Sequence, residues 1–174
     1  ADKSIFDVSN TSTIVFNGDV QNGDNMTCTP CASVNYHYTI DPVDIIPGTY
    51  DNALAIRNDV EGIAKGNIIA ADVETTNAAS VLDMATFTLT VTSDNLISGN
   101  NGSIKTQNSS ASPITLGSGI WKQEIVFNAT GTQTVPAGTY EDLTITGSGT
   151  KSTGGALTVN GVLTVEGSTT KMVL

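Results

Sequence analysis

Residues 143–167 carry one short pattern three times: Leu143-Thr144-Ile145-Thr146-Gly147, Leu157-Thr158-Val159-Asn160-Gly161 and Leu163-Thr164-Val165-Glu166-Gly167. In each copy apolar residues alternate with polar ones and a Gly closes the run, as in a short strand with one buried face. Leu143 and Leu163 are 20 residues apart, a length that suits one coil of a β-solenoid. Stacked coils bury an apolar seam that no single coil could bury. The pattern therefore predicts a parallel β-solenoid, with a β-sandwich as the alternative because alternating strands and Gly turns serve both folds.

The composition of the whole chain favours an all-β fold. Hydrophobic residues make up 39% of the 174 residues, but aromatic residues make up only 5% and charged residues only 14%. Val, Ile and Thr pack well on a pleated surface, whereas the charged residues that cover the wet face of a helix are scarce. Further strands are expected at Ser12–Phe16, Ser33–Ile40, Ala85–Val91 and Lys122–Phe127.

An internal duplication with a period of about 90 residues organises the chain. I-V-F-N at 14–17 recurs at 125–128, and P-G-T-Y-D-N-A-L-A-I at 47–56 matches P-A-G-T-Y-E-D-L-T-I at 136–145. V-E-T-T at 73–76, leading to V-L-D at 81–83, likewise matches 165–170, leading to V-L at 173–174. The first copy carries roughly 20 extra residues, from Asp19 to about Tyr38. We therefore predict a first repeat at 1–91 with a Cys-containing inserted loop and a second at 92–174, or one continuous domain.

One stretch of the first repeat competes with this interpretation. Ala53, Ile56, Val60 and Ile63 recur at helical spacing. Gly62 interrupts the stretch, however, and the counterpart in the second repeat alternates as a strand. A strand is therefore expected there, with a short helix as the alternative.

The charge of the chain excludes several classes of partner. The formal net charge is −10, and the 7 Lys and Arg residues form no basic cluster, so neither nucleic acid nor an anionic membrane surface is an expected partner. No run of about 18 apolar residues is present, so no membrane insertion is expected. The sequence begins Ala1-Asp2-Lys3 without Met, which fits a mature protein trimmed by signal peptidase. We therefore expect an extracellular protein at the cell surface.

The segment from Ile125 to Gly167, IVFNATGTQTVPAGTYEDLTITGSGTKSTGGALTVNGVLTVEG, carries a family resemblance. It resembles repeats of very large secreted surface proteins of Bacteroidetes-type bacteria, which typically run tVPAGTYxNLTixGsGtKtlgGnlTVnGxLt. The residues from Thr86 to Trp121 are also similar to that family. The resemblance covers about half of the chain well and implies a β-solenoid-like surface region, adhesive or architectural, with no known chemistry of its own.

The motif Cys28-Thr29-Pro30-Cys31 allows three kinds of chemistry: a redox dithiol, half of a zinc site or a local disulfide. A redox motif needs a βαβ context, which the pattern does not indicate. Zinc needs four ligands, and the chain offers only these two Cys, the single His37 and nearby carboxylates. A disulfide between Cys28 and Cys31 that staples the insertion is the favoured interpretation, with the other two left open.

No cofactor is predicted, and acidic turns leave calcium as the alternative. Asn17-Gly18-Asp19 and Asn22-Gly23-Asp24 are turn sequences with oxygen ligands, so Asp19 and Asp24 are candidates, although neither forms an EF-hand loop. No other metal or cofactor is predicted.

Residues suited to catalysis are few. Asp41 with Asp44, and Glu141 with Asp142, are carboxylate pairs of the kind that glycosidases use, but aromatic residues are few and the chain has a single Arg. His37 falls on the exposed side of an expected strand, and no G-x-S-x-G motif accompanies it. No catalytic residue is predicted, and the chain is not expected to be an enzyme.

The sequence thus predicts an extracellular structural or adhesive protein, a segment of a surface adhesin or a filament subunit. Leu174 is an apolar strand end with no polar cap, so we expect the stack to be continued by the natural chain or by a neighbouring subunit. Head-to-tail assembly would join Val173 and Leu174 of one copy to Ile14 and Phe16 of the next. The expected partners are copies of the chain or the rest of a longer surface protein. A carbohydrate-binding module, with glycans as partners, is the alternative.

Overall fold

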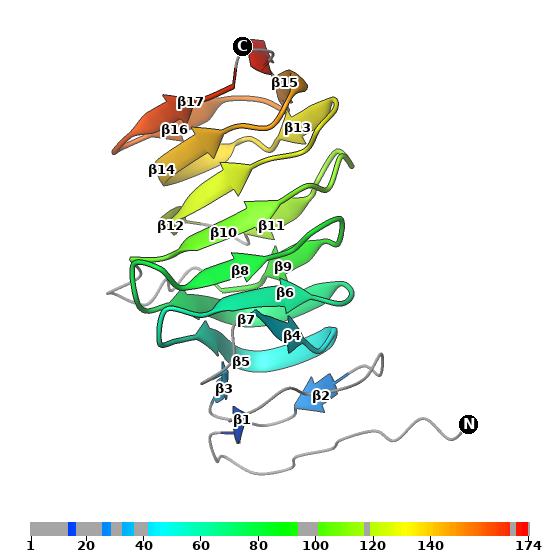
Figure 1. The fold of residues 1–174 in the computed structure, drawn as a ribbon, viewed down its shortest axis with the longest axis vertical. Coiled ribbons are helices and arrows are strands. Elements are labelled where there is room, and N and C mark those ends of the chain that lie inside the picture. Colours follow the sequence, from blue (N-terminus) through cyan, green and yellow to red (C-terminus); the bar gives the residue numbers. More distant parts are fainter. Residues whose placement is uncertain are drawn as a thin grey trace, which may run out of the picture.

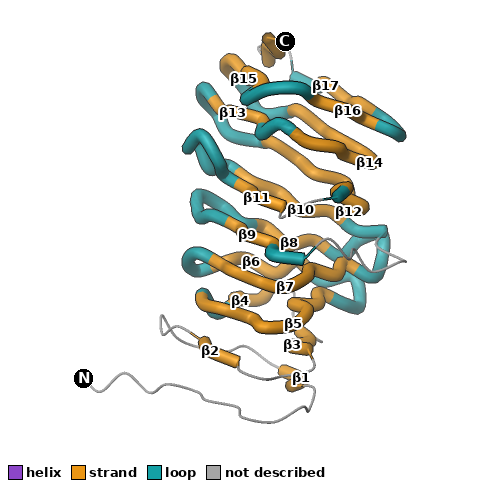
Figure 2. Tube along the Cα trace, turned by 180° about the vertical axis from the view of Figure 1, so that it is seen from behind, coloured by secondary structure: helices purple, strands orange, loops and turns teal. Residues whose placement is uncertain are grey.

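The structure is a computed structural model that describes residues 14–16, 26–28, 33–36, 42–93, 101–116, 119–167 and 170–173, with side chains described from residue 42 onward except at 170. Every regular element in these ranges is a strand, which confirms the all-β prediction (Figures 1 and 2). The described part of the chain contains no helix with the length and apolarity needed to cross a membrane.

The strands are β1 (Ile14–Phe16), β2 (Met26–Cys28), β3 (Ser33–Tyr36), β4 (Val43–Ile45), β5 (Gly48–Ile56), β6 (Glu61–Ala64), β7 (Ile68–Thr75), β8 (Val81–Asp83), β9 (Leu89–Val91), β10 (Ser103–Thr106), β11 (Ile114–Leu116), β12 (Ile120–Phe127), β13 (Gln133–Val135), β14 (Gly138–Ile145), β15 (Gly149–Thr153), β16 (Leu157–Val159), β17 (Leu163–Val165) and β18 (Thr170–Val173).

These strands stack into a single column, with β1 near one end and β18 at the other (Figure 1). A seven-stranded sheet follows the order β1-β3-β5-β7-β9-β11, with β2 also beside β5. An eight-stranded sheet follows β16-β14-β12-β10-β8-β6-β4, with β17 also beside β14, and β13-β15-β18 form a third sheet. All pairings among them are parallel, and the chain moves between sheets as it climbs. The fold is a parallel β-solenoid of about six coils, as predicted, and not a sandwich.

The coil length follows the spacing of the Leu-Thr-Ile pattern. Leu143 pairs directly with Leu163, as the 20-residue spacing predicts. Below them, Ile125 pairs with Leu143, and Ile104 with Ile125. Leu143, Ile125 and Ile104 are fully buried, since alternate residues of each strand face the interior. The inward residues of successive coils form one continuous hydrophobic core.

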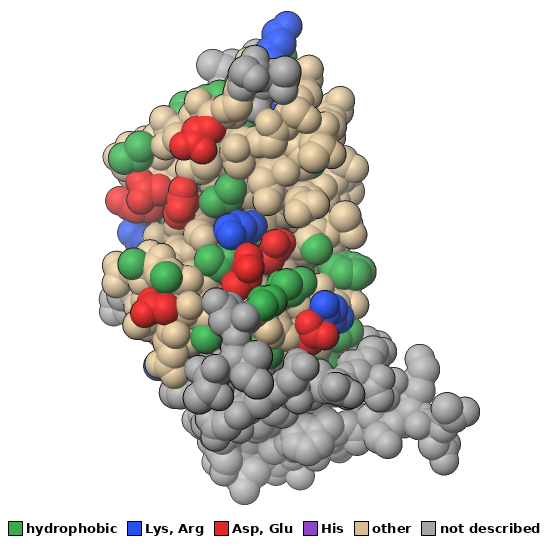
Figure 3. Space-filling model, viewed as in Figure 1, with side chains coloured by type: hydrophobic (Ala, Val, Ile, Leu, Met, Phe, Trp, Pro, Cys, Tyr) green, Lys and Arg blue, Asp and Glu red, His purple; other side chains and the backbone are tan. Residues whose placement is uncertain are grey.

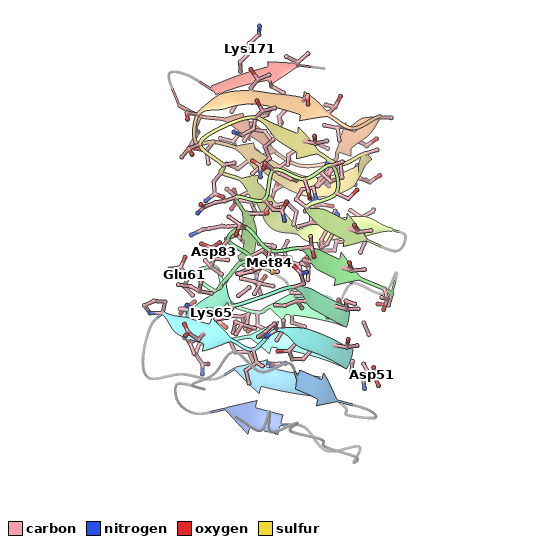
Figure 4. All side chains as sticks on the ribbon, turned by 90° about the vertical axis from the view of Figure 1, so that its right-hand side faces the viewer. Asp51, Glu61, Lys65, Asp83, Met84 and Lys171 are labelled. Carbon is pink, nitrogen blue, oxygen red and sulfur yellow. The ribbon has the colours of Figure 1, made fainter. Side chains whose placement is uncertain are left out.

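Outward residues alternate with this core along the same strands. Figure 4 shows Met84 inside the stack, whereas Asp83 and Glu61 lie at its outer side. Met84 is fully buried, and Asp83 and Glu61 are half-buried. Period-two alternation therefore places the acidic residues of this sheet at its solvent face.

The roughly 20 extra residues of the first repeat correspond to an additional coil. They include β2 and β3, which pair with β5 as parallel strands. Ile14 pairs with Val34 and Val34 with Leu54, so two coil spacings separate I-V-F from the P-G-T-Y segment in the first copy. In the second copy Ile125 pairs with Leu143 directly, one coil apart. The insertion thus lengthens the stack.

The two copies of the duplication lie in different sheets. Segments 14–16, 48–56 and 73–75 of the first copy lie in the seven-stranded sheet, whereas their counterparts 125–127, 138–145 and 165 lie in the eight-stranded sheet. The local structure of the P-G-T-Y motif is nevertheless shared. Tyr50 and Tyr140 are both buried, and each donates its hydroxyl to the carbonyl four residues earlier, Ile46 at 2.5 Å and Pro136 at 2.8 Å.

The region with helical spacing forms the strands β5 and β6, so the helical alternative is wrong. Gly62 faces the packed interior, and a Cβ atom there would lie 2.8 Å from Cδ1 of Ile45 and 3.1 Å from Cδ1 of Ile56. A larger residue at this position would force the buried side chains of Ile45 and Ile56 to move, and the interior of the stack also buries Val60.

Candidate assembly end and outer groove

The last described coil leaves its inward positions uncovered. Leu163 and Val165 are each 48% exposed, whereas Leu143 and Ile145, their partners one coil below, are 0% exposed. Two further apolar residues are exposed here: Val162 at 62%, on the outer side of the stack, and the predicted assembly residue Val173 at 43%, which pairs with the half-buried Ser152 of β15 and not with an inward residue. Leu163 and Val165 therefore occupy positions that form the core inside the stack but face solvent at its end.

The backbone edges at this end are also open among the described residues. β16 and β17 pair only with β14, and β18 pairs only with β15. The far side of each strand presents N–H and C=O groups that a further parallel strand could use. Figure 1 shows β16 and β17 forming the upper edge of the eight-stranded sheet.

At the other end of the column lies β1, the first strand of the seven-stranded sheet, which pairs with β3. The side chains of the predicted assembly residues Ile14 and Phe16 lie outside the described residues, as does Leu174. The backbone of β1 places Ile14 and Phe16 at the edge of this sheet, on the strand that begins it.

Several predicted sites fall outside the described part of the chain. Asp19, Asp24, Cys31, His37 and Asp41 lie there, and so does the side chain of Cys28, whose backbone belongs to β2. The calcium sites and the Cys28–Cys31 disulfide therefore stay predictions. Among the described residues no group of three or more His, Cys, Asp or Glu side chains is arranged to hold a metal ion.

The carboxylates considered for catalysis are placed in separate surface contacts. Asp44 forms a 2.8 Å ion pair with Lys65, whereas Glu141 lies 3.7 Å from Lys122. Asp142 accepts a hydrogen bond from the backbone N–H of Val162 at 2.7 Å. Asp44 is therefore distant from Glu141 and Asp142, both in the sequence and in the stack. The two pairs do not form one site.

Asp142 of the second carboxylate pair lines a groove that no sequence motif indicated. The groove has a volume of about 320 Å³ and lies on the outer face of β12, β14 and β17. It is lined by Asn101, Gly102, Lys122, Glu124, Asp142, Thr144, Val162 and Thr164. Figure 3 shows acidic side chains gathered over this part of the stack. Glu124 and Asp142 occupy paired positions on adjacent strands. In the sequence Glu124 and Asp142 are separated by about one coil length, but this spacing alone does not show that the two side chains are neighbours.

Two aromatic residues of the kind that stack on sugar rings are buried. Trp121 is 4% exposed and Tyr50 is 1% exposed, so neither presents a ring face to a ligand. Trp121 borders a second hollow of about 240 Å³, together with Ile114, Leu116 and Pro136. Packing therefore explains the lone Trp.

In comparisons with protein-family models, with curated proteins and with solved structures, nothing matched this chain.

Proposed function

We propose that this chain is an extracellular structural or adhesive element, a surface adhesin segment or filament subunit, whose coil stack is continued at its C-terminal end. The observation that carries the proposal is the half-exposed pair Leu163 and Val165, which occupy core positions of the stack. Exposed apolar side chains beside unpaired strand edges attract further strands. The resemblance of Ile125–Gly167 to repeats of secreted surface proteins, the acidic charge and the low share of Lys and Arg support a location at the cell surface.

A second copy of the chain has a strand that suits this end. Inside the molecule, Ile125-Val126-Phe127 of β12 pairs with Leu143-Thr144-Ile145 of β14. The strand β1 has the same sequence as the first of these, Ile14-Val15-Phe16, and β17 has nearly the same sequence as the second, Leu163-Thr164-Val165. A copy of β1 placed parallel on β17 would use the edge of I-V-F that β12 turns toward β10 and the edge of L-T-V that β14 turns toward β17, so each edge has a counterpart inside the stack. Head-to-tail stacking would then bury Leu163 and Val165 and generate a filament.

The test compares the assembly state of variants by light scattering and electron microscopy. We expect the unmodified chain to form elongated assemblies, and the double variant Leu163→Asp, Val165→Asp to remain monomeric because charges would have to be buried between coils. Both positions are half-exposed in the single chain, so folding should be retained. Removing residues 1–17 should also prevent assembly.

The matched control is Thr158→Asp on β16, in the same last coil. Thr158 is exposed and lies between Leu157 and Val159, so its side chain points away from the core. This variant should assemble as the unmodified chain does. Assembly of the double variant at normal length would contradict the proposal. A chain that stays monomeric at high concentration would contradict self-assembly and leave the rest of a longer surface protein as the partner.

A further inference from the structure

We propose that the outer groove on β12, β14 and β17 binds a neutral polyhydroxylated ligand, a short stretch of a glycan chain. Glu124 and Asp142 would accept hydrogen bonds from sugar hydroxyls, and Lys122 would donate to sugar oxygens. This binding function goes beyond the proposed structural role. The groove uses the outer face of β17 at Thr164, whereas assembly would use Leu163, Val165 and the free backbone edge of the same strand.

The two carboxylates are held in position by their own neighbours. Oε1 of Glu124 accepts a hydrogen bond from the hydroxyl of Thr144 at 2.6 Å. Oδ1 of Asp142 accepts the backbone N–H of Val162 at 2.7 Å. Each side chain is thereby oriented through one oxygen, while its second oxygen forms no hydrogen bond within the described part of the chain. Binding would therefore cost little side-chain ordering.

The groove also offers donors and a small apolar wall. Nζ of Lys122 lies 3.7 Å from Oε2 of Glu141, a distance longer than a hydrogen bond, and its side chain is 46% exposed. This ammonium can therefore donate to a ligand at small cost. The amide of Asn101 and the hydroxyl of Thr164 add further polar groups, and the exposed Val162 offers an apolar surface for the C–H side of a sugar ring.

The balance of charges selects among ligand classes. Two carboxylates with one ammonium disfavour anionic polysaccharides and phosphates. A calcium ion takes six to eight oxygen ligands, and among the described residues no three His, Cys, Asp or Glu side chains are arranged to hold a metal ion. Hydroxyl groups, in contrast, both donate and accept, so a neutral sugar can satisfy the carboxylates and the ammonium together.

The regular spacing of the strands along the groove also suits a polymeric ligand. Its lining residues come from the turn before β10 and from β12, β14 and β17, which belong to successive coils. Neighbouring strands lie about 4.8 Å apart, so polar groups recur at a regular step along the stack. A chain of linked sugar rings, which also repeats regularly, can contact several coils at once.

The experiment is NMR titration of the folded chain with cellotetraose, xylotetraose and mannotetraose, and with tetragalacturonate and calcium chloride as the competing ligand classes. At least one neutral tetrasaccharide should shift the backbone amide signals of residues 122–124, 142–144 and 162–164. Glu124→Gln and Asp142→Asn keep the oxygen that accepts from Thr144 or Val162, so the fold is retained. Each should weaken binding about tenfold, because a hydrogen bond to a charged group is replaced by a weaker one.

Glu166→Gln is the matched control, since Glu166 is exposed and follows β17 outside the groove. Its affinity for the tetrasaccharide should equal that of the unmodified chain. The proposal is overturned if no neutral tetrasaccharide shifts the groove signals. It is also overturned if calcium or tetragalacturonate shifts them and the neutral sugars do not, or if the control weakens binding as much as the two groove variants.

Discussion

The Lys151 side chain occupies an inward position where the alternating pattern leads one to expect an apolar residue. It is fully buried, and its ammonium donates hydrogen bonds to the carbonyls of Ala129, Gly131 and Ser148 at 2.7–2.9 Å. These carbonyls belong to turns of two successive coils. Burial lowers the pKa of the Lys151 ammonium, yet all three of its donors are satisfied. Lys151 therefore joins neighbouring turns from inside the stack.

Replacing Lys151 by Met should destabilise the fold by about 3 kcal/mol, because three buried carbonyls lose a charged donor. Lys171→Met is the matched control, since Lys171 is exposed on β18 and points away from the stack in Figure 4. The control should change the free energy of unfolding by less than about 0.5 kcal/mol. Urea unfolding measures both values, and equal effects of the two substitutions would contradict the role of Lys151.

The buried hydroxyl of Tyr140 predicts a pH dependence. Burial raises the pKa of Tyr140 above its ordinary value of about 10. Above pH 10 the unfolded chain loses this proton while the folded chain keeps it, so the free energy of unfolding falls as pH rises. The contribution is present in full below about pH 10.

Tyr140→Phe should cost about 1 kcal/mol at neutral pH, since the bond to the carbonyl of Pro136 is lost. The difference between the unmodified chain and this variant should shrink between pH 10 and pH 11. Urea unfolding at pH 7, 10 and 11 provides the measurement. A difference that stays constant across this range would show that the Tyr140 phenol titrates normally.

The turns between strands also constrain the sequence, and Gly147 is the clearest case. It follows β14 with φ of +84°, a conformation that favours Gly. A Cβ atom at Gly147 would also collide with the carbonyl oxygen of Ala129 in the turn one coil below. Successive turns therefore pack so closely that only Gly fits here.

Gly147→Ala should destabilise the fold by at least about 2 kcal/mol, through backbone strain and the collision with Ala129. Gly131→Ala provides the comparison, because Gly131 lies in the turn below and a Cβ there would have no heavy atom within 4 Å. That variant should leave stability nearly unchanged. Thermal unfolding of the two variants checks the prediction, which fails if their melting temperatures fall equally.

The sequence predicts most of the strands, and the places where sequence patterns were ambiguous or uninformative have physical causes. The run Leu143-Thr144-Ile145 predicts a strand because inward and outward positions alternate without interruption. Its recurrence at Leu163-Thr164-Val165 predicts the coil length. The stretch from Ala53 to Ile63 is ambiguous because its apolar residues also fit a helical period, and only the packing around Gly62 resolves it. The groove could not be predicted, since Glu124 and Asp142 become neighbours only when the register of β12 and β14 is known.

For the whole molecule, the duplication and the coil have different periods. Segments 14–16, 48–56 and 73–75 of the first copy lie in the seven-stranded sheet and their counterparts lie in the eight-stranded sheet, whereas Val81–Asp83 lies in the eight-stranded sheet and its counterpart Val173 lies in the third sheet. The sequence predicts the stack, but it does not show this change of sheet, because the number of coils between copies is not evident from the motifs. Both sheets are thus built from related strands, and a further coil could add to either one.

The open end of the column predicts how its stability is distributed. In a stack whose coils contact only their neighbours, the last coil has one partner and opens most readily. Backbone amides of β16 and β17 should therefore exchange with deuterium faster than those of β12 and β14 in the isolated chain, although the strands have similar sequences. The exposed Leu163 and Val165 mark where this opening begins.

Assembly should reverse that gradient, since a strand added over β17 supplies both hydrogen bonds and apolar cover. In assembled material, exchange at β17 should slow toward that of β14, whereas exchange at β8, inside the stack, should not change. The double variant Leu163→Asp, Val165→Asp should keep the fast exchange at all concentrations. Hydrogen-exchange mass spectrometry of monomer and assembly measures this, and unchanged exchange at β17 on assembly would place the contact elsewhere, because no strand could then cover that edge.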